Sequence, residues 1–436
     1  MRMMGKLGVG VAVALAAALA VAGPARADES RDEAARERVK KIAAELEAMR
    51  GQKFAAEVGV ETQSAEDFRK FVRGELDEEL PQELADRQSK ALQAFGLVPL
   101  GYDLRKGYED LLVSQAGAYY NPETKKFYVL MAGLPDIQLD SIILHELQHA
   151  LQDQRFDLAK LLEKARAATA DDADRASAVQ FLVEGEATYV MLKYQLKKVG
   201  MDIDKAPADR QDLAMKQVRD IDRKTLLVQA RLSAPGGPEG AELKKAIESL
   251  KDVPPFLFLG LHDPYFKGQY AVFKAFSEKG WAGVDALFET PPTSTEQILH
   301  PEKLTGAERD EPTKVDLPDL LPELGPGWKL VYANGMGEAG VLAFFDAHEV
   351  KDKAKLAAGW DGDRYALYEG PGGRTLLYWI TEWDTNEDAQ EFFEGLAKAT
   401  FEGKRLPDGS SRVDGKRVRV MNGDLDDLKK LRDLGH

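Results

Sequence analysis

Two histidines and a glutamate in one short stretch carry the clearest chemical signal of this sequence. His145, Glu146 and His149 form an H-E-x-x-H motif inside residues 141–154, SIILHELQHALQDQ. A helix advances about 100° per residue, so the two imidazoles fall about 40° apart on one face, while apolar residues fill the other. The spacing predicts that one Zn²⁺ takes both imidazoles, with the Glu146 carboxylate beside it. The alternative is a pair of structural histidines that border a core helix.

A catalytic zinc needs a third protein ligand and an open position for water. The extended motif H-E-x-x-H-x-x-G-x-x-H is excluded, because Gln152 and Arg155 occupy its glycine and last histidine positions. A glutamate from a following helix is the other source of a ligand. Glu184 lies in residues 172–199, where apolar residues recur at helical spacing. Glu184 is therefore the candidate third ligand, and Glu186 is the alternative.

With these residues the chain resembles the gluzincins, zinc peptidases in which H-E-x-x-H is followed by a liganding glutamate. The E-G-x-A form at 184–187 is similar to the zinc-ligand segment of gluzincin aminopeptidases. Gly185 has no side chain, which predicts a close approach to the histidine-bearing helix. Thermolysin-like enzymes carry an aspartate four residues after the ligand, but Thr188 stands there in this chain. The partner of the zinc histidines is therefore expected elsewhere, from Asp153 or Asp157.

Three longer segments resemble exported bacterial proteins described only as metallopeptidases. They are residues 145–157, 291–303 and 357–365. The resemblance implies a zincin-like catalytic domain, a Zn²⁺ cofactor held by His145, His149 and Glu184, and a peptide or protein substrate. It carries no information on which substrate.

The expected reaction uses water activated by the metal. Zinc would lower the pKa of a bound water toward neutrality. Glu146 would take a proton from that water as it attacks a peptide carbonyl, and would then deliver it to the leaving amine. The developing oxyanion needs a donor, for which the candidates are His300, Tyr265 and Tyr270. The alternatives are a loop histidine bonded to backbone and two core aromatics with satisfied hydroxyl groups.

The first 27 residues have the pattern of a secretory signal. Arg2 and Lys6 precede an apolar run over 7–23, and Ala25-Arg26-Ala27 offers an A-x-A cleavage site. Cleavage after Ala27 predicts a periplasmic or secreted protein with no transmembrane segment in the mature chain. An uncleaved membrane anchor is the alternative. The sequence has no cysteine, which excludes disulfides, and its net charge of −15 argues against nucleic acid and anionic membranes as partners.

Beyond the signal, the pattern predicts an α+β protein in two parts. Residues 28–302 form the catalytic domain and begin with an amphipathic helical arm over 28–51, while the polar, proline-containing residues 303–318 form a linker. Inside the catalytic domain the pattern predicts a strand over 53–62, two helices over 65–96 broken at Pro81, a helix pair over 256–279, and then a loop through His300 and Pro301. Residues 319–436 alternate strand and helix patterns, which predicts a small α+β domain. Its expected strands are 328–333, 364–369 and 374–382, its expected helices are 340–347 and 386–400, and a hairpin is expected over 411–421. The sequence does not indicate the oligomeric state.

A β-hairpin is predicted just before the zinc helix. Residues 116–131 contain two β-rich runs joined by a turn at 121–124. In zincins an edge strand in this place pairs with extended substrate, which is strand addition in physical terms. An ordinary sheet hairpin is the alternative, and both can hold.

Three functions are compatible with the sequence. The leading hypothesis is a zinc peptidase. The second is an exported binding or envelope-assembly factor that keeps a zinc site for structure, with the C-terminal domain as its working surface. The third is a zinc hydrolase that acts on a non-peptide amide or ester. Glu146 favours an enzyme, because a structural zinc has no use for a general base and usually closes with a fourth protein ligand.

Overall fold

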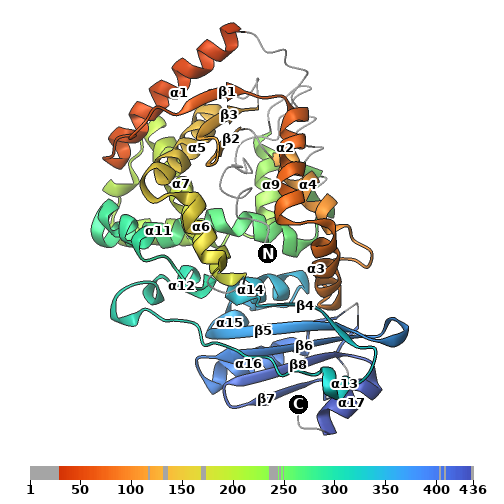
Figure 1. Cartoon of the computed structure of the whole chain (residues 1–436). Coiled ribbons are helices and arrows are strands. Elements are labelled where there is room, and N and C mark those ends of the chain that lie inside the picture. Colours follow the sequence, from red (N-terminus) through yellow and green to blue (C-terminus); the bar gives the residue numbers. More distant parts are fainter. Residues whose placement is uncertain are drawn as a thin grey trace.

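The computed structural model describes residues 29–433 apart from short gaps, and divides into a mostly helical part and a part built on a β-sheet (Figure 1). The gaps are residues 116–117, 131–135, 168–172, 235–243, 245–246, 249, 402–403 and 407–408. The signal sequence predicted for residues 1–27 lies outside the described residues. The predicted α+β class is confirmed.

In the helical part, the long helix α7 packs along α11 and also against α5 (Figure 1). The helices of this part are α1 (Glu29–Arg50), α2 (Ala65–Glu79), α3 (Gln82–Ala94), α4 (Leu104–Gln115), α5 (Asp136–Phe156), α6 (Leu158–Ala167), α7 (Asp174–Lys198), α8 (Ala208–Arg219), α9 (Arg223–Ser233), α11 (Pro255–Glu289) and α12 (Thr295–Leu299). The predicted arm is α1, and its apolar positions Val39, Ile42 and Leu46 are buried. The predicted break at Pro81 separates α2 from α3.

Two glycines let α7 and α11 touch along their backbones. A Cβ atom at Gly185 would lie 2.7 Å from the backbone nitrogen of Gln269 and closer still to the carbonyl group of Gly268. The expectation that Gly185 admits the histidine-bearing helix is therefore wrong, because the close neighbour is α11. Since this contact has no side chain between the helices, it holds α7 at a fixed distance from α11.

A small sheet lies against α5, with contacts to Glu146 in the middle of the helix and to Asp153 near its end. Its strands are β1 (Gly59–Thr62), β2 (Ala118–Asn121) and β3 (Lys126–Val129), in the order β1-β3-β2. β2 and β3 form the predicted antiparallel hairpin, and the Asn121 side chain accepts the backbone N–H groups of Glu123 and Thr124 in its turn. β2 is therefore an edge strand, as predicted. The strand expected over 53–62 is shorter and begins at Gly59.

The C-terminal part is a five-stranded antiparallel sheet with helices against it (Figure 1). Its strands are β4 (Lys329–Asn334), β5 (Trp360–Glu369), β6 (Thr375–Trp383), β7 (Ser411–Asp414) and β8 (Arg417–Gly423), in the order β4-β5-β6-β8-β7. On one face, Trp379 packs against α14 (Gly337–Ala347) and α16 (Asn386–Leu396). On the other lie residues 315–320, α13 (Leu321–Leu324) and α17 (Leu425–Asp433).

Two predicted segments differ in detail from the structure. Residues 256–279, expected as a helix pair, belong to a single helix, because Pro264 does not end α11. The helix breaks only at Lys279 and Gly280, where Gly280 has φ +60°. The loop expected before His300 contains the short helix α12, which Ser294 caps by accepting the N–H of Gln297. Across the described residues, no helix combines the length and apolarity needed to span a membrane.

Candidate metal centre

The helix α5 brings His145 and His149 together as the motif predicts. Their Nε2 atoms are 3.1 Å apart, and the exposed fraction of each residue is at most 1%. The residues between and around them on the opposite face, Leu144, Leu147 and Ala150, are buried in the core. The apolar face thus fixes the rotation of α5, and this rotation points both imidazoles to one place.

Glu184 on α7 completes a triangle of donor atoms. Its Oε2 atom lies 3.2 Å from His145 Nε2 and 3.4 Å from His149 Nε2. Ligand atoms that bind zinc tetrahedrally at about 2.0–2.1 Å are separated by about 3.3 Å, because the tetrahedral angle fixes the edge length. The three donors have this spacing. Their types, two imidazoles and one carboxylate, are those of catalytic zinc sites.

One buried oxygen without a protein partner supports the fit of a cation. Glu184 Oε1, the second oxygen of the carboxylate that faces both histidines, is buried and has no hydrogen-bond partner among the described residues. Burial lowers the pKa of His145, whereas at His149 the Glu184 carboxylate outweighs burial and raises the pKa to about 9. Burial opposes ionisation of Glu184, but the two histidines hold its pKa below the usual value. The Glu184 carboxylate thus favours positive charge at this place, and a metal that binds here would compete with protons for the imidazoles.

Glu146 is held by the edge strand of the small sheet. Its Oε2 atom accepts the backbone N–H of Tyr120 at 2.8 Å, and the residue is fully buried. The Tyr120 hydroxyl group donates to Asp153 at 2.7 Å, so β2 is tied to α5 at two points. Sequence reasoning missed Tyr120, since nothing in residues 116–131 marks which amide reaches the helix.

Gln152 is the second residue that sequence reasoning missed. Its Oε1 atom accepts from His149 Nδ1 at 2.9 Å. Neither Asp153 nor Asp157 contacts the histidines: Asp153 bonds Tyr120, and Asp157 accepts the N–H of Lys160. The expectation of an aspartate partner is therefore wrong for the described residues. The available signal was the polar residue one helical turn after His149.

The structure distinguishes the two glutamates of α7. Glu184 faces the histidines, whereas Glu186 accepts from Arg50 Nε at 2.7 Å. Both carboxylates are fully buried. Only Glu184 has an oxygen beside the two imidazoles, whereas Glu186 contacts α5 through Gln152 and offers no oxygen to the histidines among the described contacts.

Of the three candidate oxyanion donors, Tyr265 alone lies at the centre. Its ring stacks on His145 with 5.7 Å between the ring centroids. Tyr270, more than one turn further along α11, donates its hydroxyl proton to Asp212 at 3.0 Å. Tyr270 thus belongs to a group of charged residues on α8 and α11, and the expectation that it could serve the metal site is not supported by its position.

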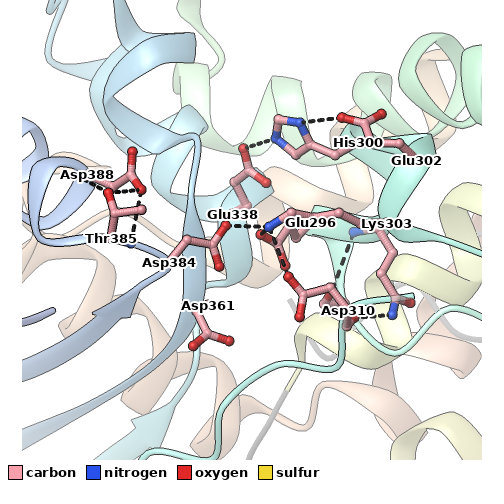
Figure 2. Close-up of polar contacts among 12 residues, drawn as sticks. Glu296, His300, Glu302, Lys303, Asp310, Glu338, Asp361, Asp384, Thr385 and Asp388 are labelled. Atoms are coloured by element: carbon pink, nitrogen blue, oxygen red, sulfur yellow. Dashed lines mark hydrogen bonds and ion pairs between the residues drawn. The ribbon is translucent and has the colours of Figure 1, made fainter. Parts of the chain in front are cut away.

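His300 lies in a different cluster, at the junction with the C-terminal part. Figure 2 shows its ring against Glu338, with 2.8 Å between His300 Nε2 and Glu338 Oε1. The chain around it joins elements, since Thr295 bonds Asp174 of α7 and accepts the N–H of Ala339 of α14. The resemblance of residues 291–303 to metallopeptidases therefore falls on a structural junction.

Residues 357–365 have a similar structural role. The Asp363 carboxylate accepts the N–H groups of Met336 and Gly337 at the start of α14, and the indole N–H groups of Trp360 and Trp379. A carboxylate at a helix N-terminus is favoured by the helix dipole.

Three carboxylates of the junction surround one ammonium group. Lys303 Nζ lies 2.6 Å from Glu296, 3.0 Å from Asp310 and 2.5 Å from Asp384 (Figure 2). Such a group of acids has metal-ligand spacing. Because the lysine already supplies the positive charge, we interpret the cluster as a hydrogen-bonded network around Lys303 and not as a metal site.

Glu296→Gln is expected to change how stability depends on pH. Burial raises the pKa of Glu296 to about 8, from a usual value of 4.5. Between these pH values the folded state holds a proton that the unfolded state releases, so the free energy of unfolding falls as pH rises. Glutamine cannot titrate, so the free energy of unfolding of the variant should not fall in this way. From about pH 5 to pH 8 the difference in unfolding free energy between variant and parent should therefore change by on the order of 3 kcal/mol in favour of the variant. Urea unfolding at both pH values measures this, and parallel curves would contradict it.

Comparison with known proteins identifies one family match. Residues 329–432 match a family described as a domain of unknown function, DUF8575. The match covers about a quarter of the chain and lies in the five-stranded sheet part, away from the histidines. No curated protein and no solved structure matches the chain.

Proposed function

We propose that this chain is an exported zinc-dependent peptidase with a zincin-like catalytic part. The observation that carries the proposal is the triangle formed by His145, His149 and Glu184, with separations of 3.1, 3.2 and 3.4 Å, next to the Glu146 carboxylate. Three protein ligands leave a position open, which is typical of catalytic zinc. Bound zinc supplies Lewis-acid chemistry, polarising a carbonyl group and lowering the pKa of water.

In the proposed reaction, side chains of the protein transfer the proton from the attacking water to the leaving amine. Glu146 accepts a proton from the attacking water and gives it to the leaving amine. The N–H of Tyr120 orients one carboxylate oxygen of Glu146 at 2.8 Å, which supports a fixed position for the base. Tyr265, stacked on His145, is the candidate donor to the developing oxyanion.

The edge strand β2 supports a peptide as the substrate. β2 ends the order β1-β3-β2, and its Tyr120 N–H reaches Glu146. A peptide in extended conformation that lies along this edge would pass the carboxylate, and backbone hydrogen bonds would hold it there.

Zinc content tests the site with a matched pair of variants. The purified parent should hold about one zinc per molecule. Glu184→Gln should lose stoichiometric zinc, because a neutral amide replaces an anionic ligand. Glu186→Gln, the same change at an equally buried position of α7, should still hold about one zinc, because Glu186 offers no donor atom to the metal and acts on His149 only through Gln152. A fall of about 10-fold in its affinity would leave the binding stoichiometric. Elemental analysis after dialysis reads both. The opposite pattern would make Glu186 the ligand.

Digestion of a diverse pool of unstructured peptides tests the activity. We expect cleavage by the parent that a chelator abolishes and added zinc restores. A parent that binds zinc and cleaves no peptide would favour the binding factor or the hydrolase of a non-peptide amide or ester.

A further inference from the structure

The Gln152 side chain fixes the proton on His149. Its Nε2 donates to the Val183 carbonyl oxygen at 3.0 Å and to Glu186 Oε2 at 2.8 Å. Because both neighbours only accept, the amide cannot be turned around, and its Oε1 must face His149 Nδ1. His149 must then carry a proton on Nδ1, which leaves the lone pair of Nε2 for a cation.

Glu186 holds Gln152 and is itself neutralised by Arg50. The exposed fractions of the two side chains are 0% and 1%, and Arg50 Nε lies 2.7 Å from Glu186 Oε1. A carboxylate buried in this way is stable only with an opposite charge and hydrogen bonds, which these two partners supply.

Arg50 is the last residue of α1 and is fastened from three sides. It pairs with Asp285 as well as with Glu186, and its guanidinium group lies 4.3 Å from the ring centroid of Trp281. The Trp281 indole N–H donates to the carbonyl oxygen of Met49 at 3.0 Å. The end of α1 is therefore locked against the last part of α11, and a firmly placed guanidinium reaches into the interior.

We propose that Arg50, Glu186 and Gln152 form a buried relay that positions His149 for metal binding, so that α1 is part of the metal centre. The relay runs from α1 through α7 to α5, and each step is a hydrogen bond or ion pair between buried groups. These three are positioning residues. The inference rests on the proposed function only for the presence of the cation.

The first test removes the amide. Gln152→Leu should weaken zinc binding by about 10- to 100-fold in competition with a chromogenic chelator, as is typical when the hydrogen-bond partner of a ligating histidine is lost. Gln88→Leu, the same change at a buried glutamine of α3, should leave the affinity at the parent value. Unchanged affinity in Gln152→Leu, or equal losses in both variants, would overturn the relay.

The second test keeps the positive charge at position 50 and removes the guanidinium group, which can bond two carboxylates at once. Arg50→Lys retains a cation beside Glu186 but cannot bond Glu186 and Asp285 together, so we expect about 10-fold weaker zinc binding with the fold retained. Arg155→Lys is the matched control, because Arg155 also pairs with Asp285 but does not contact Glu186. Equal affinities in the two variants would overturn the role of Arg50.

The absorption spectrum of the Co²⁺-loaded protein separates positioning from general stability. A ligand field depends on the orientation of His149, so Gln152→Leu and Arg50→Lys should shift the visible bands, while Gln88→Leu and Arg155→Lys should not. Spectra of all four variants identical to the parent would overturn the inference and leave the proposed function intact. A parent that binds neither zinc nor cobalt would overturn both.

Discussion

Glu146→Gln is expected to lower peptide turnover by at least about 100-fold at unchanged zinc content, because it removes the general base and none of the ligands. Glutamine has the size of glutamate and still offers an oxygen to the N–H of Tyr120, which lies 2.8 Å from the carboxylate. The fold and the metal site should therefore survive. What is lost is the ability to accept a proton from the attacking water.

The measurement compares initial rates at matched zinc content. Glu163→Gln on α6 is the control, since it makes the same change at an exposed position. We expect the control to keep the parental rate. Equal, zinc-dependent cleavage by Glu146→Gln and the parent would rule out Glu146 as the base.

Gly185→Ala is expected to destabilise the protein by about 3 kcal/mol and to lower its zinc affinity. The added Cβ atom would overlap the backbone of Gly268 and Gln269, which cannot swing aside as a flexible side chain could. The helices α7 and α11 must separate, and Glu184, the neighbour of Gly185, moves with α7. The metal ligand and the packing contact are thus displaced together.

Gly74→Ala is the matched control and should act in the opposite direction. Gly74 lies inside α2, and a Cβ atom added there meets nothing within 4 Å. Alanine should therefore stabilise the helix by about 0.5–1 kcal/mol. Urea unfolding and chelator competition read both variants. A Gly185→Ala variant as stable as the parent would mean that the glycine contact does not set the helix spacing.

Local patterns predicted the parts of the site that lie on one element. The pair His145 and His149 depends only on helical period, and the hairpin depends on the turn at Asn121. The order of strands and helices in the C-terminal part was also predictable, because apolar residues recur every second position in strands and about every 3.6 positions in helices. The structure confirms all three.

Contacts between distant segments could not be read in the same way. Arg50 and Glu186 are separated by 136 positions, and no local pattern joins a residue at the end of α1 to one on α7. Tyr270 and His300 looked available because their acidic partners, Asp212 and Glu338, lie 58 and 38 positions away. The sequence predicted a close approach at Gly185, but the local pattern does not identify the neighbouring helix, which is α11.

Phe95 packs in the core of the C-terminal sheet part, although it lies far before residues 329–432 in the sequence. Its ring meets Tyr365 and Trp379 edge-on, with 5.0 and 5.2 Å between centroids, and His348 donates to its carbonyl oxygen at 2.9 Å. A protein that carried residues 329–432 alone would leave a phenyl-sized hole beside Trp379. The segment that matches the family, residues 329–432, is therefore shorter than the set of residues that fills the core of this sheet. A truncated protein designed from the family match would lack Phe95, a residue of that core.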